Sequence, residues 1–310
     1  MRPSLAERWA DHLPQLAGVP VVTLGEGFTP LLPAPRLSER LGVELWLKWE
    51  GANPTGSFKD RGMTVAVSRA LADGAPGVVC ASTGNTAASA AAYAARAGMK
   101  AAIVVAGGAA ASSKLVQVKA VGARIIDVPG TFGDAYDASL ELAEREGFAQ
   151  VNSTNDNRIA GQMTAAYEIV DELGGLPDVL TLPYGGGGNT KAYARGFLEM
   201  SGELPRLHPT EAQRRVDTVA SAIRIADPIH RPEVEEALER SGGAVVTVSE
   251  DELLGAWRLL AHEEGLFCEP ASAAGIAALI RGAAKPGERV VCVVTGHGLK
   301  DPDAVERAAA

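Results

Sequence analysis

The sequence has few cysteines and no long apolar run. It contains three cysteines, Cys80, Cys268 and Cys292, and an odd number without regular spacing argues against a disulfide framework and for a reducing compartment. Cys80 and Cys292 stand in short β-branched runs, so we expect them to be buried strand thiols. No apolar stretch approaches the length of about 18 residues that a membrane-spanning helix needs. The N-terminal residues are polar and periodic, unlike a signal peptide, so we expect a cytoplasmic protein without a membrane partner.

Positive charge is also scarce. The chain has 29 lysines and arginines against 38 aspartates and glutamates, which gives a net charge of −9. Without a basic stripe, nucleic acid is not an expected partner. An anionic substrate would need local positive charge, because the field of the whole molecule opposes its approach. Apolar residues make up 46% of the chain, as in ordinary globular proteins.

Short apolar runs alternate with helical patterns along the chain. Such repeated βα units with continuously apolar strands predict an α/β protein, with mostly parallel sheets covered by helices on both faces. The length of 310 residues predicts one large or two modest domains. We expect strands at 43–49, 77–82, 100–106, 123–129, 177–184, 243–249 and 288–296, and helices at 60–74, 86–98, 112–122, 132–147, 158–174, 190–200, 250–265 and 271–283.

One segment does not fit this alternation. Residues 204–230 begin like a strand and become strongly polar at "TEAQRR". The sequence leaves open whether this is a surface excursion or a place where the chain is shortened.

The stretch "NPTGSFKDRG" at 53–62 places Lys59 just ahead of a predicted helix. Ser57 and Asp60 have the spacing of a capping box, which would put Lys59 in the first helical turn. The positive end of a helix disfavours an ammonium group there. A lysine whose pKa is lowered in this way suits Schiff-base chemistry; from the spacing alone, a solvated surface lysine is the alternative.

Two further turns join a strand to a helix. "STGNTAAS" at 82–89 could cradle a carboxylate at a helix N-terminus, although an ordinary capped βα turn explains the same pattern; its polar side chains are Ser82, Thr83, Asn85 and Thr86. "PYGGGGNT" at 183–190 could bind a phosphate, because only glycine lets several backbone N–H groups converge on one anion. The residues of this second loop are Gly185, Gly186, Gly187, Gly188 and Asn189.

These features together fit a site for pyridoxal 5′-phosphate. Lys59 would form the imine, and the glycine loop would hold the cofactor phosphate. Asn85 would face the ring hydroxyl, and Thr295, at the end of the last predicted strand, would meet the ring nitrogen. No metal site is expected.

The sequence resembles the threonine synthases, in the tryptophan-synthase-β-like family (fold type II) of pyridoxal phosphate enzymes. The resemblance extends from about residue 24 to residue 303 and rests on motifs that occur in family order: "GEGFTPL", "EGANPTGSFKDRGM", "CASTGNTAASAAAYAARAG", "VNSTNDNRIAGQ", "EPASAAGIAAL" and "TGHGLKDPD". It implies the four cofactor contacts just named. It also implies that the substrate phosphate is bound at the fourth motif, by Asn152, Ser153, Asn155 and Arg158.

The resemblance further implies two three-layer αβα domains with the cofactor between them. The smaller would span 60–148 and carry the asparagine loop, and the larger would combine 1–59 with 149–310. A lyase of threonine biosynthesis, forming a homodimer, would convert O-phospho-L-homoserine and water to L-threonine and phosphate by γ-elimination and addition of water at Cβ. Lys59 would then be both covalent anchor and general acid/base.

The sequence departs from the family pattern at three places. The loop reads "GGGGN", as in serine/threonine dehydratases; Ala109 stands where we align a lysine; and Ala160 and Met163 stand where Glu and Lys are common. A serine/threonine ammonia-lyase or a β- or γ-replacement enzyme of a specialised pathway therefore remains an alternative, as does a non-catalytic binding protein.

Overall fold

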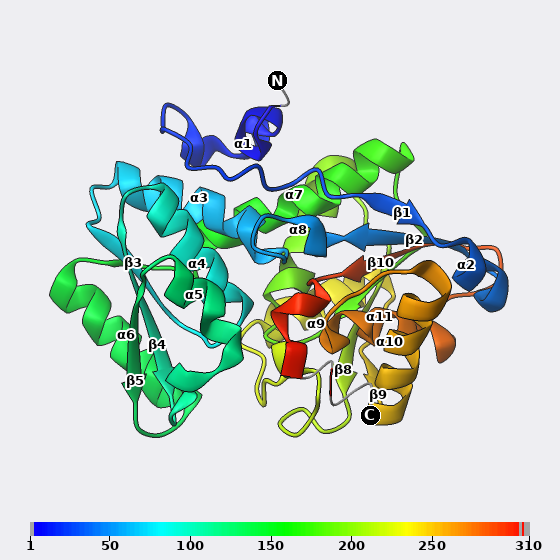
Figure 1. Cartoon of the computed structure of the whole chain (residues 1–310). Coiled ribbons are helices and arrows are strands. Elements are labelled where there is room, and N and C mark those ends of the chain that lie inside the picture. Colours follow the sequence, from blue (N-terminus) through cyan, green and yellow to red (C-terminus); the bar gives the residue numbers. More distant parts are fainter. Residues whose placement is uncertain (1–2, 304–305, 307–310) are drawn as a thin grey trace. The chain divides into compact units, whose positions relative to one another are not determined.

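A computed structural model of the chain describes residues 3–303 and 306. The chain forms two compact units (Figure 1). The first unit comprises Met1–Gly27 and Asn53–Thr164, and the second comprises Phe28–Ala52 and Ala165–Ala310. The domain limits inferred from the resemblance, 60–148 against 1–59 with 149–310, stay a prediction.

The first unit is built on a parallel sheet with strand order β5-β4-β3-β6. Successive residues of β3 point to opposite faces, as expected for a strand: Val78 and Cys80 pack with α3, α4 and α5, while Val79 and Ala81 pack with α6. Helices therefore cover both faces of the sheet (Figure 1). The bounds are β3 Gly77–Ala81, β4 Lys100–Ala106, β5 Arg124–Val128, β6 Ala149–Gln150, α3 Lys59–Ala72, α4 Asn85–Arg96, α5 Val116–Ala120 and α6 Phe132–Glu146.

The second unit contains a sheet with strand order β1-β2-β10-β7-β8-β9, in which only the β1–β2 pair is antiparallel. One face of β10 packs against α2, α10 and α11, and the other against α7, α8 and α9. The bounds are β1 Leu31–Pro33, β2 Glu44–Trp49, β7 Val179–Pro183, β8 Arg206–Ala212, β9 Val246–Val248, β10 Arg289–Val294, α2 Pro35–Leu41, α7 Asp156–Leu173, α8 Gly188–Ser201, α9 Arg231–Ser241, α10 Glu250–Glu264 and α11 Ala274–Ile280.

Short helical turns complete the described chain. They are α1 Leu5–Arg8 and the 3₁₀ turns Ala10–His12, Pro14–Leu16, Glu50–Ala52, Ala109–Ala111, Ser113–Leu115, Ser221–Ile223, Pro270–Ala273 and Gly298–Lys300. Within the described residues, no helix is both long and apolar enough to cross a membrane. The same residues contain no cluster of three or more His, Cys, Asp or Glu side chains arranged to hold a metal ion.

The α/β class and the parallel sheets predicted from the sequence are confirmed. Cys80 and Cys292 are buried strand thiols, as expected. The helix expected at 112–122 is wrong in extent, because Ser113–Leu115 is a 3₁₀ turn and only Val116–Ala120 is α-helical. Helix α9 was not predicted, because its core-facing residues are few among many charged ones; its buried residues are Val234 and Ala237.

Candidate active site residues

Lys59 is the first residue of α3, so its predicted place in the first turn is confirmed. The capping box predicted from Ser57 and Asp60 is wrong. Phe58 occupies the N-cap without a side-chain hydrogen bond, so the pair stands one residue out of register. The buried Asp60 carboxylate instead accepts hydrogen bonds from the Thr55 N–H and hydroxyl and from the Ser89 hydroxyl, each 2.6 Å long. Asp60 thus ties the turn before Lys59 to α4.

The surroundings of Lys59 combine an aromatic ring with a buried hydroxyl. Lys59 is half-buried, and its ammonium lies 4.3 Å from the centroid of the Phe58 ring, a cation–π contact. The Ser57 hydroxyl is buried and makes no hydrogen bond with the described residues. A buried hydroxyl without a partner costs free energy, so Ser57 is available to a bound ligand near Lys59.

The asparagine loop, Ser82–Thr86, connects β3 to α4 in the first unit. Gly84 is the N-cap and Asn85 is the first residue of α4. Ser82, Thr83, Asn85 and Thr86 are all half-buried. The Ser82 hydroxyl accepts a hydrogen bond from the Gly84 N–H at 3.1 Å. The loop therefore presents an amide and hydroxyls at the positive end of a helix, where an anionic group is stabilised.

Two asparagines of the predicted substrate-phosphate region bind the main chain. The Asn152 side chain accepts from the Ala81 N–H and donates to the Ala81 carbonyl, both at 3.0 Å. The Asn155 side chain donates to the Gln150 carbonyl at 2.9 Å and accepts from the Arg158 N–H at 3.2 Å. These amides shape the loop around the half-buried Ser153. Both side-chain amides therefore bind the main chain, and the prediction that they contact the substrate phosphate stays a prediction.

Arg158 is fully buried but incompletely paired. Its Nη1 donates to the Val151 carbonyl at 3.1 Å, whereas Nε and Nη2 find no hydrogen-bond partner among the described residues. Burial lowers the pKa of the guanidinium to about 10. A buried cation with open donors is costly unless an anion pairs with it. Arg158 is therefore suited to bind an anion in forked geometry.

The glycine loop, Gly185–Gly188, joins β7 to α8 in the second unit. Gly187 caps α8 in the left-handed conformation, with φ of 87°. A Cβ atom at Gly187 would lie 3.0 Å from Val234 and 3.1 Å from His230, so a larger residue would have to displace these neighbours. Asn189 Nδ2 and Thr190 Oγ1 are buried donors without a partner among the described residues. The backbone and these two side chains fit a phosphate group.

Thr295 follows directly after β10 and is almost fully buried. Its hydroxyl lies 2.9 Å from the Ser272 hydroxyl, and Ser272 also accepts from the Gly296 N–H at 2.8 Å. Sequence reasoning did not single out Ser272, although it stands in the motif "EPASAAGIAAL". The pair consists of two neutral hydroxyls; the prediction that Thr295 meets the ring nitrogen stays a prediction.

His297 is held between aromatic rings. Its ring centroid lies 5.7 Å from that of Trp49 and 5.8 Å from that of Phe267. Its Nδ1 accepts a hydrogen bond from the Leu299 N–H at 3.2 Å, and burial lowers its pKa. These contacts make His297 a structural part of the loop after β10.

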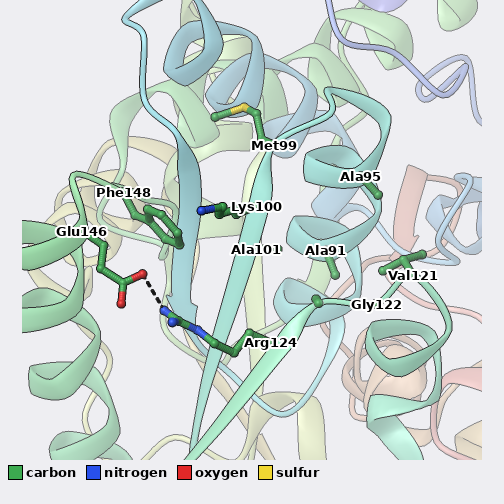
Figure 2. Close-up of a pocket in the computed structure, with 11 residues that line it drawn as sticks. Ala91, Ala95, Met99, Lys100, Ala101, Val121, Gly122, Arg124, Glu146 and Phe148 are labelled. Carbon is green, nitrogen blue, oxygen red and sulfur yellow. Dashed lines mark hydrogen bonds and ion pairs between the residues drawn. The ribbon is translucent and has the colours of Figure 1, made fainter.

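A groove of about 500 Å³ lies elsewhere on the first unit, at the amino edge of its sheet (Figure 2). Lys100 and Arg124 line it at the starts of β4 and β5, and Arg124 forms an ion pair with Glu146 at 2.7 Å. None of the predicted site residues lines this groove. Ligands of open α/β sheets bind at the carboxyl ends of the strands, where the asparagine loop stands.

The structure thus brings the predicted residues together in two groups. Lys59, the asparagine loop and the region of Arg158 belong to the first unit, and the glycine loop and Thr295 belong to the second.

Known proteins resemble the chain over nearly its whole length. Residues 22–296 match the family model described as "Pyridoxal-phosphate dependent enzyme". The threonine synthase of Bacillus sp. (strain ULM1) is 48% identical, over 98% of this chain and 92% of that protein. The threonine synthase of Methanocaldococcus jannaschii is 43% identical, over 97% and 82%.

Solved structures show the same fold. The maize serine racemase structure superimposes with a TM-score of 0.80 at 22% identity, covering 97% of this chain and 95% of that one. The processed form of threonine deaminase isoform 2 from Solanum lycopersicum gives a TM-score of 0.80 at 23% identity, over 98% and 93%. The fold is that of the fold type II enzymes. The chain belongs to the pyridoxal-phosphate dependent enzymes and, within them, to the threonine synthase family.

Proposed function

We propose that this chain converts O-phospho-L-homoserine and water into L-threonine and inorganic phosphate. The observation that carries the substrate assignment is Arg158, a buried guanidinium with two nitrogens open to an anion. A serine or threonine ammonia-lyase, the alternative suggested by the "GGGGN" loop, acts on a substrate without phosphate and would leave these donors unpaired. Relatives of 43–48% identity that are threonine synthases favour the same assignment.

The cofactor contacts are proposed from the geometry of each group. Gly185–Asn189 would bind the cofactor phosphate through backbone N–H groups and the Asn189 amide. Asn85 would donate to the ring hydroxyl, and the neutral Thr295 hydroxyl would face the ring nitrogen. When bound, pyridoxal phosphate supplies an electron sink that stabilises negative charge next to the substrate amino group.

The first unit would carry the proton transfers and the leaving group. Lys59 Nζ would remove the protons from the substrate Cα and Cβ and, after the phosphate has left, return protons at Cγ and Cα as general base and acid. Water supplies the hydroxyl at Cβ. Arg158, with Ser153, binds the substrate phosphate and stabilises its added negative charge as the Cγ–O bond breaks. Ser82, Thr83 and Thr86 bind and orient the substrate carboxylate at the start of α4. Asn152 and Asn155 position the phosphate-binding region.

Two properties outside the site are also proposed. The three free cysteines support a cytoplasmic location. A homodimer rests on the family resemblance alone and would appear as a doubled mass in light scattering. The partner of the chain would be a small amino-acid substrate, and neither nucleic acid nor a membrane.

The role of Lys59 can be tested with Lys59→Ala and, as a matched control, the exposed Lys119→Ala. Lys59→Ala should lose the visible absorbance of covalently held cofactor and release phosphate from O-phospho-L-homoserine roughly 10³-fold more slowly or worse. Lys119→Ala should match the unmodified chain in both. Retention of absorbance and turnover in Lys59→Ala would refute the assignment.

A further inference from the structure

A segment far from the glycine loop in sequence forms its outer wall. This covering segment, Thr218–His230, is the end of the region that did not fit the βα alternation. The Ala222 carbonyl and Ile223 Cα stand 3.3 Å from a Cβ position at Gly185, and Ile225 Cδ1 stands 3.5 Å from one at Gly186. The His230 N–H donates to the Gly186 carbonyl at 3.0 Å. The path of the glycine loop is therefore set by the covering segment as well as by its own residues.

The covering segment is fastened at both ends. At its start, Glu250 accepts from the Thr218 hydroxyl at 2.7 Å and from the Val219 N–H at 2.5 Å. At its end, His230 is the N-cap of α9 and is 5% exposed. A cluster formed by Lys191, His230 and Glu233 joins this end to α8.

The centre of that cluster is Lys191, which is 8% exposed. Its Nζ lies 2.7 Å from Glu233 Oε1 on α9 and 3.5 Å from His230 Nδ1. Its backbone N–H donates to the Gly187 carbonyl at 3.0 Å. Lys191 is thus bonded through its main chain to the glycine loop and through its side chain to the element that covers the loop.

Lys191 is the fourth residue of α8, and its side chain is largely buried. The ammonium of Lys191 stands near the positive end of α8. Glu233 pairs with this ammonium, but its side chain is 36% exposed, so solvent screens the pair. Side chains in a helix lean toward its N-terminus, which for Lys191 is the glycine loop. A doubly charged phosphate in that loop would add a second anion beside the Lys191 ammonium.

We infer that Lys191 is a positioning residue for the cofactor phosphate: with Glu233 and His230 it holds Gly186 and Gly187 in place and adds positive charge beside the loop. This inference rests on the proposed binding of the cofactor phosphate by Gly185–Asn189. It assigns Lys191 no contact with the reacting atoms.

The test compares two cofactor forms that differ only in the phosphate. The cofactor is removed from the purified chain, and dissociation constants for pyridoxal phosphate and for pyridoxal are measured by absorbance titration. Lys191→Met should lower the preference for the phosphorylated form about tenfold, leave pyridoxal affinity unchanged and shift the ³¹P resonance of the bound cofactor. Lys191→Gln, which keeps a hydrogen-bonding group, serves if Lys191→Met does not fold.

Two comparison variants separate the possible failures. Arg206→Met breaks the partly buried Arg206–Glu288 ion pair of the same unit and should leave the preference unchanged. Gly187→Ala, which adds a Cβ to a left-handed glycine, should lower it. If Gly187→Ala lowers the preference for pyridoxal phosphate over pyridoxal and the Lys191 variants do not, the inference about Lys191 is wrong. The assignment of the phosphate site to Gly185–Asn189 is then unaffected. If Gly187→Ala has no effect, the phosphate site itself is misassigned. An equal loss of affinity for both forms in the Lys191 variants would mean a merely structural role and overturn the inference.

Discussion

Gly161 lies so close to Arg61 that a Cβ atom added to the glycine would be 2.0 Å from the carbonyl oxygen of the arginine. The contact is reciprocal, because a Cβ at Gly62 would be 2.5 Å from the Arg158 carbonyl oxygen. Helix α3, which begins with Lys59, and the part of α7 that carries Arg158 therefore touch through their main chains. Glycine at both positions fixes the relation between the proposed proton-transfer group and the proposed phosphate-binding group.

Gly161→Ala should destabilise the protein. The added methyl group overlaps backbone, which cannot move aside as a flexible side chain could, so we expect a loss of about 3 kcal/mol. Chemical denaturation followed by circular dichroism measures it. The matched control is Gly255→Ala in α10, where a Cβ meets nothing within 4 Å, and there we expect a gain of about 0.5–1 kcal/mol from the higher helix propensity of alanine. Equal effects of the two substitutions would show that the close contact does not limit stability.

Arg158→Met should weaken recognition of the substrate phosphate. Losing charge-assisted hydrogen bonds of about 1.5–3 kcal/mol predicts a KM for O-phospho-L-homoserine raised roughly 10- to 100-fold. Inhibition by inorganic phosphate should weaken in parallel, while the cofactor absorbance stays. Arg158→Lys keeps the charge but loses the forked hydrogen-bond geometry. Its KM should lie between those of the unmodified chain and Arg158→Met. Unaltered phosphate inhibition in Arg158→Met would place the substrate phosphate elsewhere.

Thr295→Asp should change the partition among products. A neutral hydroxyl, here 2.9 Å from the Ser272 hydroxyl, leaves the pyridine less cationic than a carboxylate would. With aspartate we expect more turnovers to end in transamination, detected as cofactor converted to its amine form. Thr295→Ser, which keeps the hydroxyl, should partition like the unmodified chain. If Thr295→Asp leaves the share of transamination unchanged, the Thr295 hydroxyl does not limit transamination, and its proposed role is wrong.

The thiols should be inert in the folded protein. Burial raises the pKa of Cys80 and of Cys292 to about 12 and that of Cys268 well above its ordinary value. A thiol reagent at pH 8 should therefore label none of the three until denaturant is added. Rapid labelling of the native chain would contradict the burial of these residues.

The same thiols predict a loss of stability at alkaline pH. Their pKa is higher in the folded than in the unfolded chain, so between pH 9 and about 12 the folded state binds more protons. The stabilisation is complete below pH 9 and declines as the pH rises. Denaturation midpoints measured from pH 8 upward should fall, and the fall should shrink when alanine replaces Cys80.

Much of the site could be predicted because its parts are local. The glycine loop, the asparagine loop and Lys59 each stand where a short motif meets the start of a helix. The predicted capping box is wrong because the Asp60 carboxylate accepts hydrogen bonds from Thr55 and Ser89. Ser89 is 29 residues away in sequence. A spacing rule within four residues cannot anticipate a partner on another helix.

The contacts of Lys191 also join residues far apart in sequence, which short-range patterns cannot predict. Lys191 and Glu233 are 42 residues apart and meet because β8 and the covering segment return the chain to the glycine loop. No local sequence pattern predicts the contact between Lys191 and Glu233. Likewise, the bonds of Asn152 to Ala81 span 71 residues, so its backbone-binding role appears only in the folded chain.

The most direct test is the stoichiometry of products from cofactor-loaded protein. Supplied with O-phospho-L-homoserine, the chain should release phosphate and L-threonine in equal amounts, and supplied with L-serine or L-threonine it should form 2-oxo acid far more slowly. Absence of phosphate release together with rapid 2-oxo acid formation from either amino acid would contradict the proposed function and identify an ammonia-lyase.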